Sequence, residues 1–250
     1  MPIRFSSCSF GYRRRQRVIE NLDCELPPGR TVFLGPNGAG KSTVLGLASS
    51  ALSPRTGQVV YEGLSSTGRD VGAYRRRIAW MPQQLARVPG LTARDQVAYA
   101  GWLKGMSKSD AWHQSLRALR QVELGDRAED KIDQLSGGQQ RRVGVAQALV
   151  HGAEVLLLDE PTAGMDPRQR QVFLDVLGNL SSFVHVVLAT HDTADLDTVY
   201  DNVLVLLDGK LVFSGSVEGF LAHAEAGAVP GRRADSAYHL LTERSHACVS

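Results

Sequence analysis

Short apolar runs that end at turn residues mark the first part of the chain. Residues 3–12, 21–29 and 31–35 each read as a short strand, and Pro27-Pro28-Gly29 closes the second of them. The second run also alternates roughly between apolar and polar residues, as a half-buried strand does. We therefore predict a β-rich N-terminal region.

Helical periodicity replaces these runs in two stretches. Apolar residues recur with helical spacing from Val44 to Leu52 and stop at Ser53-Pro54. From Arg94 to about Val150 the spacing is again helical, with few β-branched runs. We expect the second stretch to form a helical insert, which we place at about residues 86–151.

Buried strands return after this helical stretch. Residues 154–160 and 183–191 contain nearly continuous apolar runs, typical of strands that are covered on both faces. Residues 202–215 read as a hairpin, in which Asp208-Gly209 suits a two-residue turn. Strands that alternate with helices predict an α/β core.

Composition places the 250-residue chain among ordinary globular proteins, because 43% of its residues are hydrophobic and 22% are charged. The formal net charge of +2 does not argue for a nucleic-acid partner, and we interpret the arginines at 13–15 and 75–77 as solvated faces. Cys8, Cys24 and Cys248 are too few and too far apart for a disulfide framework or a metal site, which fits a reducing cytosol. The sequence shows no signal-peptide pattern and no apolar run of membrane-spanning length, so we expect that the chain does not cross a bilayer itself.

The strongest chemical motif is a glycine-rich loop between a predicted strand and a predicted helix. It matches the phosphate-binding pattern G-x-x-x-x-G-K-[ST] and consists of Gly35, Pro36, Asn37, Gly38, Ala39, Gly40, Lys41, Ser42 and Thr43. Glycines let backbone N–H groups surround phosphate oxygens, and the start of the next helix adds partial positive charge. Lys41 is expected to reach the β- and γ-phosphates, and Ser42 to offer its hydroxyl to Mg²⁺. The loop predicts binding of a nucleoside triphosphate.

Two adjacent carboxylates, Asp159 and Glu160, end the first of the later buried strands. Ligands of α/β sheets bind at the carboxyl ends of strands, so both side chains are expected at that edge. Asp159 suits the coordination shell of Mg²⁺, and Glu160 suits a base that accepts a proton from the water attacking the γ-phosphate. An acidic pair at a strand end is common, but behind a phosphate-binding loop it becomes a catalytic candidate.

A second glycine-rich helix start lies in the stretch "LSGGQQRRVGVAQAL". Ser136 is a suitable N-cap, and Gly137-Gly138 leave the first N–H groups of the helix uncovered, which makes this helix start a candidate anion site. Because residues 35–43 already form one phosphate cradle, we expect the second site to serve the nucleotide of another copy.

Four motifs in order, "GPNGAGKST", "LSGGQ", "LLLDEPT" and "ATHD", resemble those of the nucleotide-binding subunit of ATP-binding cassette (ABC) transporters. The resemblance covers roughly residues 3–224. It implies an α/β fold, with a P-loop NTPase (RecA-like) core, an N-terminal antiparallel β subdomain and an inserted α-helical subdomain. Residues 225–250 would form a C-terminal tail, in which residues 234–242 read as a short helix. Further stretches, such as "LTARDQVAYAGWLKGM", are most similar to the export branch that handles drugs, antibiotics or lipids.

The resemblance further implies that two cassettes stack head to tail with ATP and Mg²⁺ between them. The P-loop of one copy would face Ser136, Gly137, Gly138 and Gln139 of the other. Four more roles follow from the family pattern: Tyr12 on the adenine ring, Gln83 at Mg²⁺ and the attacking water, Asp166 at the dimer seam and His191 at the γ-phosphate. Simpler alternatives stay open, with Tyr12 an ordinary strand aromatic, Gln83 a polar loop residue, or Gln84 in place of Gln83.

The chain departs from the commonest cassette pattern at Gly164-Met165, Gly144 and Gln147, and none of these positions faces phosphate in the family. The resemblance therefore implies hydrolysis at both sites of a homodimer, although a different partner cassette would break that symmetry. ATP binding would close the pair, and hydrolysis would release it.

A separate transmembrane permease subunit is the implied partner, and no nucleic acid is expected. The resemblance places the contact in residues 85–105, which are apolar enough to dock or equally to belong to the core. The chain would then lie at the cytoplasmic face of the plasma (inner) membrane as a peripheral subunit. Two rival interpretations are a non-transport cassette that acts on ribosomes or DNA, and a P-loop kinase or switch GTPase. The motif "LSGGQ" argues against the second rival, and the lack of heptads or internal repeats argues against the first.

Overall fold

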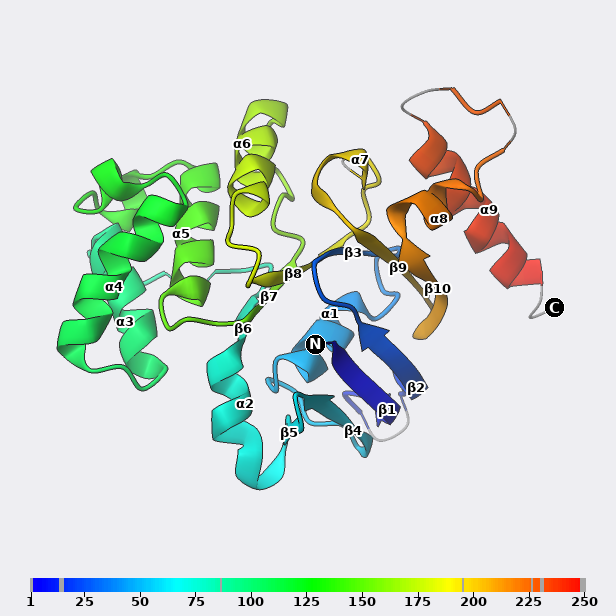
Figure 1. Ribbon diagram of the computed structural model, residues 1–250, viewed down its shortest axis with the longest axis horizontal. Helices are drawn as coiled ribbons and strands as arrows, with labels where there is room; N and C mark the ends of the chain where they lie inside the picture. The colour runs from blue at the N-terminus through cyan, green and yellow to red at the C-terminus, as the bar shows by residue number, and fades with distance from the viewer. Residues whose placement is uncertain are drawn as a thin grey trace.

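The computed structural model describes residues 2–13, 16–85, 87–194, 196–225, 227–229 and 232–247. Part of the arginine cluster at 13–15 and Cys248 thus lie outside the described residues. Residues of two sheets pack together in one buried cluster. The helical region lies at the opposite end of the molecule from the C-terminal helix (Figure 1). Among the described helices, none is long and apolar enough to span a membrane.

The larger sheet has the strand order β10-β9-β3-β8-β7-β6 and is parallel except for its edge hairpin. In that order its strands are Lys210–Ser216, Asn202–Leu207, Arg30–Leu34, His185–Thr190, Val155–Asp159 and Ile78–Met81. The hairpin turn predicted at Asp208-Gly209 is present, with φ values of 46° and 75° that suit a two-residue turn. Parallel strands covered on both faces explain why the runs in the sequence are almost wholly apolar.

The smaller sheet is antiparallel and has the order β2-β1-β4-β5. Its strands are Ile19–Leu26, Ile3–Phe10, Thr56–Tyr61 and Leu64–Ser65. The prediction of a β-rich N-terminal region is therefore confirmed, but its three predicted strands do not share one sheet. The third predicted strand joins the parallel sheet, and two unpredicted strands that follow the glycine-rich loop complete the antiparallel one. Pairing between distant segments decides this assignment, and local periodicity carries no information about it.

The helices on the N-terminal side of β7 group into two sets. Helix α1 and helix α2 flank the antiparallel sheet, and α3, α4 and α5 form the helical region between β6 and β7 (Figure 1). Their bounds are Lys41–Ala48, Val71–Arg77, Ala93–Leu103, Lys108–Gln121 and Gly137–Leu149. Helix α1 is shorter than predicted, because it ends at Ala48 and Ser50 then adopts a left-handed φ of 61°. Helix α2 and strand β6 are missing from the sequence-based prediction.

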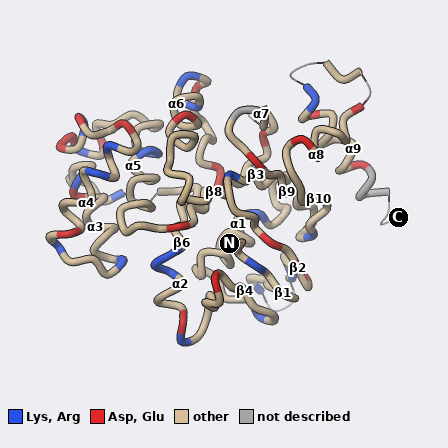
Figure 2. The backbone as a smooth tube through the Cα atoms, in the orientation of Figure 1, with Lys and Arg blue, Asp and Glu red and all other residues tan. Residues whose placement is uncertain are grey.

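Four further helices follow β7: α6 (Pro167–Gly178), α7 (Leu196–Val199), α8 (Val217–Leu221) and α9 (Arg233–Ala247). Short 3-10 turns occupy Gly68–Asp70, Gly125–Arg127 and Ile132–Gln134. Helix α9 contains the short helix predicted at 234–242 and extends it at the C-terminal end. Basic and acidic residues are interspersed along the described chain rather than gathered on one element (Figure 2).

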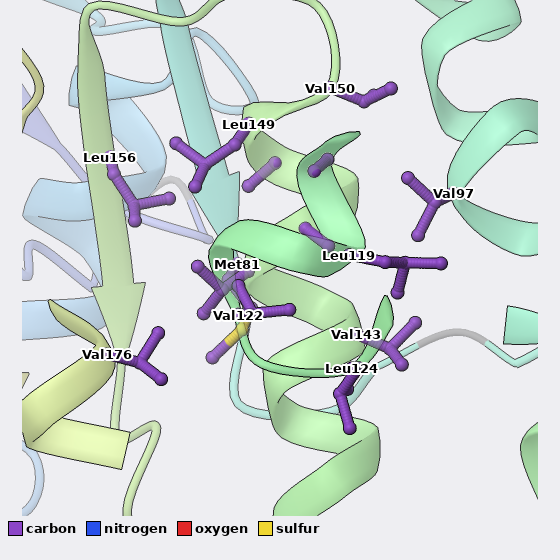
Figure 3. Packing of buried hydrophobic residues seen from close by; sticks show 14 of the residues in the cluster. Met81, Val97, Leu119, Val122, Leu124, Val143, Leu149, Val150, Leu156 and Val176 are labelled. Carbon is purple, nitrogen blue, oxygen red and sulfur yellow. The ribbon is translucent and has the colours of Figure 1, made fainter. Parts of the chain in front are cut away.

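The parallel sheet separates two cores because side chains alternate between its faces. Leu157 and Val187 point to the face covered by α1 and the antiparallel sheet. Leu156, Leu158 and Val186 point to the other face, where the helical region and α6 pack (Figure 3). Each buried side chain of this kind stabilises the fold by about 1.5–3 kcal/mol. This packing holds the strands rigidly and so places the loops at their carboxyl ends.

Candidate active site

Three neighbouring strands, β3, β8 and β7, deliver the chemical motifs to one edge of the parallel sheet. Leu34 at the end of β3 pairs with Thr190 of β8, and Asp159 at the end of β7 pairs with Ala189. The glycine-rich loop follows β3, His191 follows β8 and Glu160 follows β7. Since parallel strands end together, motifs far apart in the sequence meet here, as predicted.

The glycine-rich loop needs its glycines for two physical reasons. Gly38 and Gly40 have φ values of 86° and 103°, which side-chain-bearing residues rarely adopt. A Cβ atom on Gly35 would lie 2.4 Å from the backbone oxygen of Leu206. Gly40 also precedes α1 without a side-chain cap, so the first N–H groups of that helix lack a side-chain acceptor there. The loop thus presents backbone donors to an anion, whereas Ala39 packs into the core.

Lys41 is only 5% exposed and lies folded back beneath the loop. Its Nζ donates to the backbone oxygens of Gly35 at 2.6 Å and Pro36 at 3.2 Å. It also lies 3.6 Å from Oε1 of Glu160. Burial lowers the pKa of Lys41, while the nearby carboxylates of Glu160 and Asp159 oppose that shift. A phosphate anion would supply the countercharge that this buried ammonium otherwise draws from carboxylates and carbonyls.

Ser42 and Asp159 form a pair that suits Mg²⁺. Oγ of Ser42 donates to Oδ1 of Asp159 at 3.0 Å, although the two residues are far apart in sequence. Burial raises the pKa of Asp159, and the hydrogen bond from Ser42 opposes the shift. Among the described residues, no three His, Cys, Asp or Glu side chains converge to hold a metal. Mg²⁺ fits this pair nevertheless, because it is commonly bound by one or two protein oxygens together with substrate phosphates and water.

Glu160 stands at a break in the backbone. Its φ of 46° is left-handed, which is uncommon for a residue with a side chain. In a continuing strand, the side chains of Asp159 and Glu160 would point to opposite faces. Here Asp159 bonds to Ser42 and Glu160 approaches Lys41, so both carboxylates face the glycine-rich loop. The unusual backbone conformation places two acidic side chains in one site.

His191 completes the row of side chains at this edge. Its Nδ1 lies 3.0 Å from Oε1 of Glu160, and Oγ1 of Thr190 donates to Oε2 of Glu160 at 3.4 Å. The His191 side chain is 56% exposed, while that of Glu160 is 11% exposed. Thr190 and His191 therefore both bond to the buried carboxylate of Glu160, and the exposed imidazole of His191 lies between that carboxylate and solvent.

The glycine-rich loop, Glu160 and His191 line one cavity of about 490 Å³. Besides the loop, the cavity is lined by four predicted site residues from other parts of the chain, namely Tyr12, Gln83, Glu160 and His191. The Tyr12 ring is 63% exposed, stacks edge-on against Phe10 and brings its hydroxyl to 3.2 Å from Oγ1 of Thr43. Gln84 does not line this cavity, so the geometry favours Gln83 over that alternative. Sequence reasoning missed Gln16, Val18 and Ala163, which line it without belonging to a motif.

The residues Ser136, Gly137, Gly138 and Gln139 lie outside that cavity. They open α5, where Oγ of Ser136 accepts from the Gln139 N–H at 3.3 Å and Oε1 of Gln139 accepts from the Ser136 N–H at 2.8 Å. This capping box satisfies two donors of the helix start, which the prediction of uncovered N–H groups did not foresee. Gly137 remains exposed, and a Cβ atom built on it meets no atom within 4 Å. We refer to residues 136–139 as the signature half, and to residues 35–43 with Asp159 and Glu160 as the P-loop half.

A second cavity of about 430 Å³ lies beside the signature half and includes Gly137 and Gly138 in its lining. Gln83 and Ala163 line both cavities, so the two adjoin. Nη1 of Arg141 donates to the backbone oxygen of Gln83, which ties α5 to the loop after β6. Asp166 is exposed and caps α6, its Oδ1 accepting from the Gln169 N–H at 2.8 Å. Neither Asp166 nor the signature half is brought to the P-loop of the same chain.

Comparison with known proteins identifies the arrangement. The sequence pattern described as "ABC transporter" matches residues 19–163, more than half of the chain. The chain belongs to the ABC transporter family. The resemblance seen in the four motifs and the P-loop NTPase fold are both confirmed, and this ABC cassette is an ATP-binding subunit and an ATPase.

The names of the cassette's relatives point to different functions, one of them a resistance protein and another an import protein. The cassette is 29% identical over 204 residues to the linearmycin resistance ATP-binding protein LnrL of Bacillus subtilis, and the match covers 81% of this chain and 65% of LnrL. It is 34% identical over 202 residues to the Fe(3+) ions import ATP-binding protein FbpC of Escherichia coli O157:H7, covering 80% of this chain and 58% of FbpC. In mouse ATP-binding cassette sub-family A member 17, the matching part is 12% of the protein, at 33% identity. The cassette therefore spans less than two thirds of the length of each of these relatives.

Solved structures show the same fold. An ATP-binding subunit of an ABC transporter superimposes with a TM-score of 0.79 at 22% identity, covering 97% of this chain and all of the other. A dimeric bacterial ABC transporter cassette superimposes with a TM-score of 0.74 at 26% identity, covering 86% of this chain and 98% of the other. The fold described above is thus that of ABC cassettes.

Proposed function

We propose that this cassette hydrolyses ATP as half of a head-to-tail pair and so powers transport, in the export direction, through a separate permease subunit. One observation carries the proposal. Most of the P-loop half, including Lys41, Ser42 and Glu160, lines a single cavity, whereas Gly137 and Gly138 of the signature half line an adjoining cavity and Gly137 is exposed. A second copy that places its signature half over the P-loop half would use both, and the existence of a solved dimeric cassette of the same fold supports the pairing of two copies.

The proposed roles in hydrolysis follow from the contacts at the P-loop half. Lys41 and the backbone N–H groups of residues 35–43 hold the phosphates. Ser42, Asp159 and Gln83 are the residues that would hold Mg²⁺, and the ion would offset negative charge on the phosphates. Glu160 accepts the proton of the attacking water, and His191, at 3.0 Å from it, holds that carboxylate and contacts the γ-phosphate. Tyr12 offers its exposed ring to the adenine.

Transport is driven by differential binding. The paired state gains contacts to the γ-phosphate from both the P-loop half of one copy and the signature half of the other, and it loses them when that phosphate leaves. A ligand shifts an equilibrium only by its difference in affinity for the two states, so the γ-phosphate is the switch. The family match supports a homodimer or a pair with another cassette, and we propose the homodimer.

A groove beside the helical region supports the proposed contact with a permease. It has a volume of about 470 Å³ and draws part of its lining from Leu85, Ala100 and Leu103 in the segment predicted to dock. The same segment also exposes apolar surface, since Val88 is 40% and Leu103 62% exposed, so it is not simply core.

The direction of transport and the membrane location belong to the proposal. The similarity to a linearmycin resistance subunit supports export, whereas the similarity to Fe(3+) import subunits is of comparable strength. We favour export because the stretch "LTARDQVAYAGWLKGM" resembles that branch. A peripheral position on the cytoplasmic face of the membrane follows if the permease holds the cassette. ATP is expected to be hydrolysed on that side.

Affinity purification of the tagged chain from detergent-solubilised membranes of its native cell tests the partner. Co-purifying proteins are identified by mass spectrometry, with a Lys41→Ala variant to show which associations need ATP. We expect a stoichiometric protein with several membrane-spanning helices. Ribosomal or DNA-bound proteins, without any membrane protein, would instead favour a non-transport cassette. Transport of candidate cargo into or out of vesicles carrying the purified complex then decides the direction.

A further inference from the structure

The segment that follows His191 is held from two sides. On one side, Nη1 of Arg170 in α6 forms an ion pair with Oδ2 of Asp192. On the other, Oγ1 of Thr193 donates to Oδ1 of Asp235, the third residue of α9. Thr193 is 7% exposed, so its hydroxyl has little access to water as an alternative partner. The C-terminal helix is thus bonded two residues away from the imidazole of the active site.

His191 needs such support because its own packing is poor. Its side chain is 56% exposed and bonds to Glu160, so its position depends on the backbone that carries it. The adjacent residues form a compact turn, in which Asp192 N–H donates to Oγ1 of Thr190 and Ala194 N–H donates to Oδ1 of Asp192. A shift at Thr193 would move this turn and the imidazole with it.

Helix α9 is a firm point of attachment for that turn. Ala234 and Ala237 are buried in the small core cluster that also holds Leu196 and Phe220. Oγ of Ser236 accepts from the backbone N–H of Glu225, which fixes the start of the helix to the preceding segment. Packing on one side and hydrogen bonds on the other hold Asp235 in place next to Thr193.

We propose that α9 positions His191 for hydrolysis. Asp235 and Thr193 are the positioning residues, because the hydrogen bond between them connects α9 to the turn that carries His191. The inference rests on the proposed role of His191 at the γ-phosphate. It gives a function to α9, a helix that belongs to none of the four motifs. Because the Thr193–Asp235 bond does not touch the P-loop half, ATP affinity should not depend on it. Its loss should lower the rate of the hydrolytic step, for which the imidazole and Glu160 must be aligned.

Kinetics of the full-length chain with the substitution Asp235→Ala test the inference. We expect kcat for ATP hydrolysis to fall about tenfold while KM changes less than about twofold, since small misplacements of reacting groups cost one to two orders of magnitude in rate. Thr193→Ala should have the same effect, and combining both substitutions should add nothing further. Thr193→Ser keeps the hydroxyl and should restore most of kcat.

Thr242→Ala is the matched control, because it removes a side-chain hydrogen bond within α9, from Oγ1 of Thr242 to the backbone oxygen of His239, without touching Thr193 or the start of the helix. It should leave kcat unchanged. Equal kcat in the wild type and Asp235→Ala would overturn the inference. So would a loss of rate in both Asp235→Ala and Thr242→Ala that follows a lowered Tm, because that pattern indicates general destabilisation.

The variant His191→Ala separates this inference from the proposed function. If His191→Ala lowers kcat and Asp235→Ala does not, the inference fails while the proposed role of His191 stands. If His191→Ala leaves kcat unchanged, both fail. If His191→Ala and the double variant with Asp235→Ala have the same reduced kcat, α9 acts through His191 as proposed.

Discussion

The P-loop half and the signature half of this cassette both contain glycine-rich helix starts, yet the fold treats them differently. In the P-loop half, Lys41 folds back onto the loop, and Asp159 and Glu160 approach it from the end of β7. The signature half closes on itself through the capping box of Ser136 and Gln139 and leaves Gly137 exposed. In the P-loop half, the charged groups find partners of opposite charge within the chain. At the signature half, the contacts that the structure describes are those of its own capping box.

This difference shows how one folded polypeptide can offer an open site to the second copy that we propose. Buried charges such as Lys41 are tolerable in the single chain because carbonyl oxygens and carboxylates surround them. The capping box makes the helix start of α5 stable without an anion. The signature half is therefore free to bind a second nucleotide without loss of folding stability. Four substitutions test this comparison between the two halves.

The largest effect is expected from Glu160→Gln in the P-loop half. Glutamine keeps the shape of the side chain but cannot accept a proton, so kcat should fall about 10²–10⁴-fold. ATP binding should persist, and the ATP-bound pair should accumulate because hydrolysis no longer releases it. ATP turnover and size-exclusion chromatography with ATP measure the two outcomes. Normal turnover in this variant would refute the assigned base.

A smaller effect is expected from Gly137→Ala in the signature half. The new methyl group meets no atom within 4 Å in the single chain, so its Tm and ATP affinity should be preserved. In the closed pair it would stand where a phosphate approaches the helix start, so ATP-dependent dimerisation should weaken and kcat should fall about 10²-fold. Gly72→Ala in α2 is the control, since its Cβ would lie 3.9 Å from the Nη1 atom of Arg76. Unchanged dimerisation in Gly137→Ala would contradict the sandwich.

Arg141→Ala tests the connection between the two halves. The guanidinium donates to the backbone oxygen of Gln83, and its loss frees the loop that carries this proposed Mg²⁺ ligand. We expect kcat to fall about fivefold with KM nearly constant, because positioning rather than binding is disturbed. Arg127→Ala, which removes an exposed ion pair with Asp130 in the same helical region, should have no effect on kcat. A change in KM alone would show that the Arg141 contact serves binding.

The smallest effect on turnover is expected from His151→Phe, beyond the far end of α5. Burial lowers the pKa of His151 to about 4, so the folded chain keeps the ring neutral where the unfolded chain protonates it. Stability is therefore lost as the pH falls from about 6.5 toward 4, by about 1 to 2 kcal/mol between pH 7 and pH 5. His151→Phe should remove this part of the acid sensitivity in urea unfolding, with turnover near that of the wild type. An unaltered pH dependence would show that His151 does not cause it.

Local pattern predicted much of the fold, and its failures have a common cause. The hairpin at Asp208-Gly209 and the buried strands β7 and β8 were predicted, because their turn chemistry and apolar runs are local signals. The strand Thr56–Tyr61 was not, and its place beside β1 depends on pairing between residues far apart in the chain. The end of α1 at Ala48 was also missed, since apolar spacing continues to Leu52, which packs on the core from outside the helix.

The candidate site likewise contains residues that belong to a sequence motif and residues that only the tertiary structure brings to the cavity. Residues 35–43, Asp159 and Glu160 were predicted from the sequence, because phosphate chemistry demands a fixed order of residue types around a strand and a helix, whereas His191 was predicted from the family resemblance. Gln16, Val18 and Ala163 were not identified, since they line the cavity through position alone.

The sequence by itself determined the family, the α/β class and the residues that suit phosphate, since each of these depends on spacing along the chain. The tertiary structure alone decided how Asp159 and Glu160 face one loop, because that depends on a left-handed backbone at Glu160. It also decided that the bond from Thr193 to Asp235 ties the C-terminal helix to the His191 turn. Contacts between distant segments arise from the packing of the whole chain, and no local pattern of residues encodes them.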